Sequence, residues 1–212
     1  MRHDTMKYFG LAIWISGLLL CACNQNDKKA SSASEANATN ATGDKEQIQN
    51  LIREMLVWSD AANSIDLLPV IADDQDSVYI GFDLQKHREN LAKLRQTNIF
   101  SAAFVDNYNQ IIMVLDEGLK KGRYGTWLVD DLHPFAFSNG YSPWCNCQDI
   151  GDWRKVEVRV IRLTDSEGEL EWFWGDHNAG AGNRFRAVKE NGKWKVAYLS
   201  GFDFNEATRK IE

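Results

Sequence analysis

The sequence predicts an α+β domain in which N-terminal helices pack on a curved antiparallel sheet. Apolar residues recur at helical spacing in the first half of the chain, and after residue 153 they alternate with polar residues as in half-buried strands. The 212 residues, 44% of them hydrophobic, suffice for a single domain with one core. The formal net charge of −6 disfavours nucleic acid as a partner, because nucleic-acid-binding surfaces are basic.

Residues 1–22 are predicted to be a signal peptide. Arg2 and Lys7 supply the positive charges at its start, and residues 8–20 supply an apolar stretch that is short for a transmembrane helix. No second apolar run of that kind follows in the sequence. The N-terminal segment therefore predicts export from the cytoplasm.

The end of this segment, Leu-Cys-Ala-Cys at residues 20–23, resembles the lipobox of bacterial lipoproteins. The resemblance selects Cys23 as the lipidated residue, because modification of Cys21 would place the bulky Leu20 at the cleavage position. Acyl chains on Cys23 would hold the mature protein in a membrane. Asn24 stands where many inner-membrane lipoproteins carry Asp, which indicates the outer membrane of a Gram-negative bacterium. The expected location is the cell envelope, outside the cytoplasm.

Residues 23–43 are predicted to be a disordered tether, since they are rich in Ser, Ala, Asn and Thr and show no apolar period. The folded domain is then expected to span residues 44–212. Asp44 and Gln47 match a capping box, which predicts the start of the first helix. Its apolar stripe would be formed by Ile48, Leu51, Ile52, Met55 and Leu56.

Two further helices are expected before residue 122. Asp83 is a predicted N-cap of the second, and Thr97 or Asn98 marks the expected start of the third. The third would end at Lys-Lys-Gly, residues 120–122, with cations at the negative end of its dipole and glycine as the stop. A short strand is predicted at residues 78–82.

The sequence predicts no metal site and no cofactor. The acidic run at residues 73–76 offers three carboxylates, but it lacks the ligand pattern of a calcium loop and is interpreted as a solvated turn. His87 has no His or Cys three or four residues away, so it is interpreted as a half-exposed helix residue and not as a metal ligand.

Residues 124–153 form a long loop that is unusually rich in aromatic side chains. Loops of this length usually pack against a core or serve a function. Tyr141, Trp144 and Trp153 are therefore candidate ligand-binding residues.

Cys145 and Cys147 in this loop allow three interpretations. They could form a disulfide, which would be strained and reducible. They could bind a metal with His133 or His177, although two thiolates one residue apart are not the usual zinc spacing. They could also be inert thiols, at least one of them buried, and this interpretation is favoured.

Residues 154–204 predict three or four consecutive antiparallel strands. The alternation of apolar residues breaks at Ile161, which indicates a bulge, and Asn191-Gly192 is a strong signal for a two-residue hairpin. Trp194, Val196 and Tyr198 are expected on one face. Trp172 and Trp174 share a face of an earlier strand, and are either a ligand platform or, as favoured for each ring alone, core residues.

Three segments carry a resemblance to a known fold: FSAAFVDNYNQII at residues 100–112, PWCNCQD at residues 143–149 and ENGKWKVAYLSG at residues 190–201. Over residues 44–204 the chain resembles an uncharacterised family of secreted bacterial proteins with the nuclear-transport-factor-2-like, or cystatin-like, fold. The resemblance implies a cone-shaped α+β domain with its site between sheet and helices. It implies no reaction, because this fold includes isomerases, dehydratases and binding modules.

Three functions are compatible with the sequence. The favoured one is a non-enzymatic binding or interaction module that captures a small hydrophobic or aromatic-compatible ligand, or a protein, in an aromatic-lined pocket. The second is an isomerase or dehydratase whose general base is Asp149, Asp176 or His177, since a carboxylate against tryptophan rings has a raised pKa suited to proton transfer. The third is an inhibitor or immunity-type protein whose acidic surface blocks a basic target.

Overall fold

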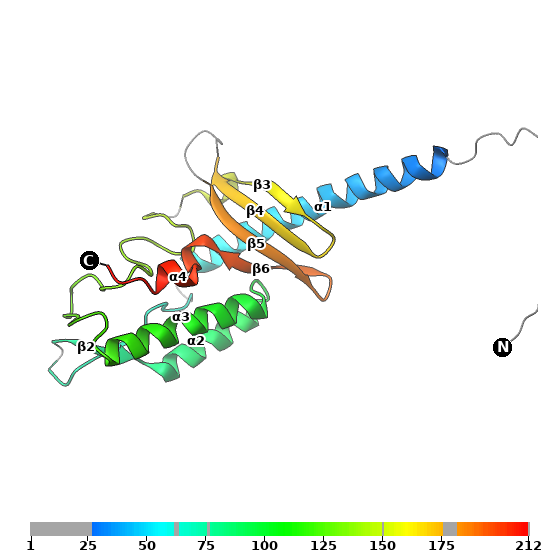
Figure 1. The fold of residues 1–212 in the computed structure, drawn as a ribbon. Coiled ribbons are helices and arrows are strands. Elements are labelled where there is room, and N and C mark those ends of the chain that lie inside the picture. Colours follow the sequence, from blue (N-terminus) through cyan, green and yellow to red (C-terminus); the bar gives the residue numbers. More distant parts are fainter. Residues whose placement is uncertain (1–26, 62–63, 76, 150, 176–181, 212) are drawn as a thin grey trace, which may run out of the picture. The chain divides into compact units, whose positions relative to one another are not determined.

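The computed structural model describes residues 27–61, 64–75, 77–149, 151–175 and 182–211, with backbone alone for residues 27–41. The chain divides into two units, Met1–Ala36 and Asn37–Glu212, and all strands among the described residues lie in the second. This second unit is α+β, as predicted, with helices and two antiparallel sheets (Figure 1). Among the described residues, no helix combines the length and the apolar character needed to cross a membrane.

Helix α1 spans Asp27–Asp60 and therefore begins well before Asp44. This differs from the tether expected at residues 23–43. The segment from residue 27 contains no proline and is rich in alanine, the strongest helix former, so it can be helical without an apolar face. The buried stripe of α1 follows the prediction and consists of Ile48, Leu51, Ile52, Met55 and Leu56.

Asp44 lies inside α1, so the predicted capping box is wrong. Its carboxylate Oδ1 instead accepts hydrogen bonds from Lys189 Nζ at 2.8 Å and from the Trp194 indole Nε1 at 2.9 Å. Burial acts to raise the pKa of Asp44, but these two hydrogen bonds and the positive charge of Lys189 together outweigh it and hold that pKa below its ordinary value. Asp44, which the sequence pattern marks as an N-cap, thus links α1 to the sheet through its side chain.

Helix α2, Leu84–Gln96, begins where the sequence predicts. The side chain of its N-cap Asp83 accepts hydrogen bonds from the backbone N–H groups of Gln85 and Lys86. Its buried side includes His87, which is 1% exposed. His87 is thus a helix residue as expected, but the prediction that it is half-exposed is wrong. Desolvation lowers the pKa of His87, although the hydrogen bond with Asn109 acts in the opposite direction.

Helix α3, Ala102–Lys120, lies beside α2 and begins later than predicted. Thr97 is the C-cap of α2, and Asn98 has φ of 57°, a left-handed conformation that interrupts the helical path. Ser101 is the N-cap of α3, where its hydroxyl accepts a hydrogen bond from the backbone N–H of Phe104. The C-terminal end at Lys120 is as predicted.

A small hairpin precedes α2 and consists of β1, Val70–Ala72, and β2, Tyr79–Phe82. The second strand was predicted, and the first was not. Between them, Asp73 Oδ1 accepts hydrogen bonds from the backbone N–H groups of Ser77, at 2.7 Å, and Val78, at 3.2 Å. The carboxylate at the start of the acidic run therefore closes a turn, which agrees with the interpretation favoured over calcium binding.

The larger sheet has four antiparallel strands in consecutive order, and α1 crosses one of its faces (Figure 1). We call this the inner face and the opposite one the outer face. Residues 99–101 lie along the β6 edge, where Ser101 N–H donates to Val196 O and Val196 N–H donates to Ile99 O. The strands are β3 at Val156–Leu163, β4 at Glu167–Trp174, β5 at Asn183–Glu190 and β6 at Lys193–Leu199.

Two register shifts bend this sheet. The first lies between Val160 and Arg162, which confirms the bulge predicted at Ile161. The second was not predicted: Ala187 pairs with Val196 but its neighbour Arg186 pairs with Tyr198, so β6 has one extra residue at this point. The expectation that Tyr198 shares the face of Val196 is therefore wrong. The predicted hairpin between β5 and β6 is present, with φ of 52° at Asn191 and 77° at Gly192.

Candidate functional site

Two of the five aromatic residues predicted to bind a ligand, Trp144 and Trp172, belong to the core. Trp172 is 0% exposed and Trp144 is 5% exposed. The indole of Trp144 packs at centroid distances of 4.7 to 6.1 Å against four other rings, those of Trp58, Phe100, Phe104 and Phe202. These contacts support the interpretation of the rings as core residues over that of a ligand platform.

The remaining three predicted ligand-binding residues lie nearer to the surface. Trp174 is half-buried and meets Trp172 edge to face at a centroid distance of 5.1 Å. Tyr141 is half-buried, and its hydroxyl donates a hydrogen bond to the Ala136 carbonyl at 3.1 Å. Trp153 is exposed, with the Arg154 guanidinium 5.1 Å from its ring centroid. The structure thus separates Trp153 from the buried aromatic residues.

Of the three predicted general bases, Asp149 alone lies within the described residues. Asp149 is exposed, so it lacks the burial against aromatic rings that the enzymatic hypothesis requires. Asp176 and His177 lie outside the described residues, as does the predicted lipidation site Cys23. Within the part of the chain that the structure describes, no group of three or more His, Cys, Asp or Glu side chains is arranged to hold a metal ion.

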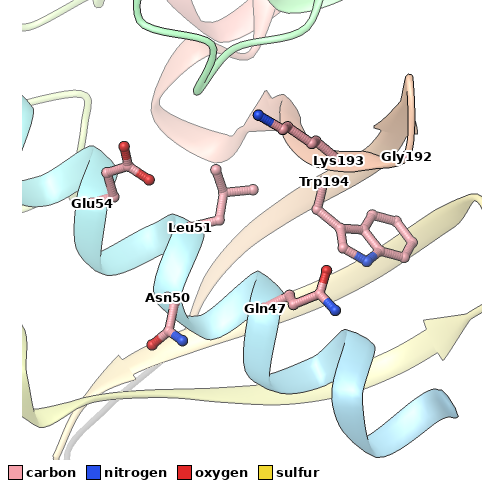
Figure 2. A pocket seen from close by; sticks show the side chains of 7 residues that line it. All are labelled: Gln47, Asn50, Leu51, Glu54, Gly192, Lys193 and Trp194. Atoms are coloured by element: carbon pink, nitrogen blue, oxygen red, sulfur yellow. The ribbon is translucent and has the colours of Figure 1, made fainter.

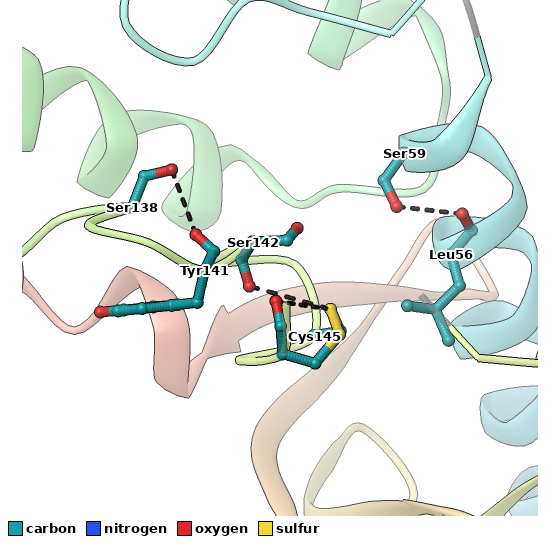
Figure 3. Close-up of a disulfide and its surroundings, with 7 residues drawn as sticks. Leu56, Ser59, Ser138, Tyr141, Ser142 and Cys145 are labelled. Carbon is teal, nitrogen blue, oxygen red and sulfur yellow. Dashed lines mark hydrogen bonds between the residues drawn. A yellow bond between two sulfur atoms is a disulfide. The ribbon is translucent and has the colours of Figure 1, made fainter. Parts of the chain in front are cut away.

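Cys145 and Cys147 form a disulfide, in place of the free thiols that the sequence favours (Figure 3). Their Cα atoms are 5.1 Å apart, within the range that a disulfide spans. The Cys145 sulfur lies 3.8 Å from the carbonyl oxygens of both Ser142 and Cys147. Closing so short a loop reduces the conformational entropy of the unfolded chain by an amount worth only about 1.5 kcal/mol, so the disulfide adds little to the stability of the fold.

The outer face of the sheet carries a cross-strand row of charged residues in the order Arg159, Glu171, Arg184. The Glu171 carboxylate is bonded on both sides: Oε2 accepts from Arg159, and Oε1 accepts from Arg184 Nε at 3.4 Å. Glu171 is only 8% exposed, whereas both arginine side chains are more than half exposed. The buried carboxylate therefore positions two arginines that remain accessible to solvent.

A second row lies beside the first, in the order Arg162, Glu169, Arg186, Tyr198. The Arg186 guanidinium carbon is 5.2 Å from the Tyr198 ring centroid, a cation–π distance. The Tyr198 hydroxyl donates to Asp203 Oδ2 at 3.1 Å, and burial together with the Asp203 charge raises the pKa of this phenol. Tyr198 is therefore a neutral hydrogen-bonding residue next to the arginines.

These two rows, which we call the arginine face, contain four arginines and two glutamates, a net charge of +2. The chain as a whole has a net charge of −6. Sequence reasoning missed the arginine face because the arginines come from separate strands. The sequence did show arginines alternating with apolar residues in β3 and in β5. Only the strand register, however, places the arginines of these two strands on either side of the same β4 residues.

A shallow hollow of about 250 Å³ lies between α1 and the β5–β6 hairpin (Figure 2). Leu51 and Trp194, both nearly buried, are its apolar part. Exposed amide and charged side chains surround them, so the hollow suits a small polar group more than an apolar ligand. The polar residues are Gln47, Asn50, Glu54 and Lys193.

Comparison of the chain with protein-family models, with curated proteins and with solved structures finds no significant match.

Proposed function

We propose that this chain is a non-enzymatic interaction module of the bacterial cell envelope that binds an acidic segment of a partner protein on the arginine face. The observation that carries the proposal is the excess of arginine over glutamate in two adjacent rows of an otherwise acidic protein. Arginine and tyrosine are enriched at the energetic centres of protein interfaces, and Arg186 and Tyr198 lie together in this region.

The buried aromatic residues support a protein partner over a small molecule. The interpretation as a ligand-binding cone requires rings such as those of Trp172 and Trp144 to line an open cavity, whereas both are packed in the core. The exposed position of Asp149 weighs against it as a general base. The partner proposed here also differs from the basic target of an inhibitor, because the arginine face attracts carboxylates.

The fold proposed for this module is the nuclear-transport-factor-2-like cone. Helices that precede a four-stranded antiparallel meander support this proposal, as do the two register shifts that bend its strands. A crystal structure of residues 37–212 would test it. Curvature of the sheet around α1 is expected, and a flat sheet would contradict the proposal.

Loss of two arginines from the arginine face should weaken binding of acidic peptides. Substitution of Arg162→Gln and Arg186→Gln removes the net charge of +2 but leaves the Arg159–Glu171–Arg184 row intact. A fluorescein-labelled polyglutamate peptide, followed by fluorescence anisotropy with the full chain at low ionic strength, should bind about tenfold more weakly to the variant. Added salt should weaken binding to the parent chain.

The matched control is Arg88→Gln with Arg95→Gln on α2, where both side chains are exposed. This variant has the same total charge as the first one, so it should bind the peptide as the parent chain does. Equal weakening in both variants, or no binding of the peptide to the parent chain, would contradict the proposal. Unchanged far-ultraviolet circular dichroism would show that each variant keeps its fold.

The proposed membrane anchor predicts a complete change of location for Cys23→Ala. Without the thiol at Cys23 no acyl chains can be attached, so the protein should move from the membrane fraction to the soluble fraction after cell lysis. The control Cys21→Ala should stay in the membrane fraction, because Cys21 precedes the predicted cleavage position. Membrane association of Cys23→Ala would show that the anchor is assigned wrongly.

A further inference from the structure

The two residues of the Cys145–Cys147 disulfide differ in exposure. Cys145 is 1% exposed, whereas Cys147 is partly exposed and follows the exposed residue Asn146. Attack on a disulfide requires an incoming thiolate to reach one sulfur in line with the bond, so accessibility decides which sulfur is attacked. Cys147 is the more exposed residue of the pair, so its sulfur is the expected point of attack and the Cys145 sulfur the expected leaving group.

The loop that carries the disulfide is held in place by contacts that do not involve the sulfur–sulfur bond. The backbone N–H of Ser142 donates to the Cys147 carbonyl at 2.7 Å, and the N–H of Cys145 donates to the Ser142 carbonyl at 3.3 Å. Trp144 anchors the loop in the aromatic core, where its ring centroid lies 4.7 Å from that of Phe202. The two cysteines are therefore kept close together whether or not they are bonded.

The disulfide closes a ring of only three residues, Cys145, Asn146 and Cys147. Such a short loop contributes little through restriction of the unfolded chain, so a structural role does not account for it. Asn146 has φ of 53°, and asparagine is among the residues that adopt this left-handed conformation most readily. The arrangement thus places the partly exposed residue Cys147 of a closely held pair in an anchored turn.

We propose that Cys145–Cys147 is a thiol–disulfide exchange site that oxidises a pair of cysteine thiols in a peptide or protein. A thiolate of the substrate attacks Cys147 Sγ, the Cys145–Cys147 bond breaks, and its electron pair goes to Cys145 Sγ, which takes a proton from water. The second substrate thiolate then attacks the substrate sulfur of the mixed disulfide and releases Cys147 as a thiolate. One protein disulfide and two substrate thiols become two protein thiols and one substrate disulfide.

The test uses the full chain with Cys21→Ser and Cys23→Ser, so that Cys145 and Cys147 are the two cysteines left to react with the probe. The probe is a synthetic peptide with two reduced cysteines, quenched with N-ethylmaleimide and analysed by mass spectrometry. The chain should oxidise the peptide stoichiometrically and about tenfold or more faster than glutathione disulfide at the same concentration. A rate no greater than that of glutathione disulfide would overturn the proposal.

Single substitutions test the roles of the two sulfurs. In Cys145→Ser the accessible Cys147 remains, and it should form a mixed disulfide with glutathione disulfide about tenfold faster than the buried Cys145 does in Cys147→Ser. Equal rates would contradict the assignment of Cys147 as the attacked sulfur. The double variant Cys145→Ser/Cys147→Ser should keep the circular dichroism spectrum of the parent, and its unfolding would show a structural role in place of the proposed one.

Discussion

Replacement of Trp172 by alanine is expected to reduce the free energy of unfolding by about 3–5 kcal/mol. Trp172 is fully buried on the inner face of the sheet, paired with Val158 on one side and Asn183 on the other. Its removal would leave a cavity beneath Trp174, which it contacts edge to face. Urea denaturation, followed by far-ultraviolet circular dichroism, measures the loss as a shift of the transition midpoint.

The matched control is Trp153→Ala, which removes the same side chain from an exposed position. It should change the free energy of unfolding by about 0.5 kcal/mol or less. Similar effects of the two substitutions would show that Trp172 is not a core residue and would reopen its interpretation as a ligand platform. Trp172→Phe retains most of the buried surface, so it should reduce the free energy of unfolding by more than Trp153→Ala and by less than Trp172→Ala. It provides a measurable variant if Trp172→Ala does not fold.

Substitution of Gly201→Ala should also destabilise the fold strongly, by about 1–3 kcal/mol or more. A Cβ atom at this position would lie 2.0 Å from the Pro143 carbonyl oxygen and 2.7 Å from its carbonyl carbon. Because the obstacle is backbone, no side-chain rotation can relieve the contact, and the turn that holds Cys145 and Cys147 must move. Thermal or urea denaturation of the variant measures the decrease in the free energy of unfolding.

Gly43→Ala is the control for Gly201→Ala. Gly43 lies within α1, and a Cβ atom there would meet nothing within 4 Å. Alanine has a higher helix propensity than glycine, so this substitution should stabilise the protein by about 0.5–1 kcal/mol. The two substitutions are therefore expected to change the free energy of unfolding in opposite directions. A neutral Gly201→Ala would show that residues 142–147 do not pack against Gly201 as closely as the structure indicates.

The sequence predicted caps, turns and bulges well where the backbone conformation depends on one or two neighbouring residues. Asp83 caps α2, Asn191-Gly192 closes the β5–β6 hairpin, and the break in alternation at Ile161 marks a bulge. The same kind of signal failed at Asp44, because a residue suited to an N-cap is equally suited to a tertiary hydrogen bond with Lys189. Capping patterns do not distinguish these two uses.

The predicted ligand-binding residues show why a candidate site was harder to predict than the fold. The prediction that Trp172 and Trp174 share a face is confirmed by their pairing with Val158 and Val156. Alternation along a strand separates the two faces of a sheet, but it does not say which face is open to solvent. That depends on what packs against the sheet, and here α1 crosses the face on which Trp172 is buried.

The sequence by itself determined the α+β class, the order of helices α1 to α3 and of the four strands of the larger sheet, and the apolar stripe of α1, because these depend on residues close together in the chain. The tertiary structure decided which residues meet across the sheet and in the turns. One extra residue in β6 turns Tyr198 toward Arg186, and the fold of the middle loop brings Cys145 and Cys147 into a disulfide. Both outcomes depend on strand register and chain path, which local composition does not specify.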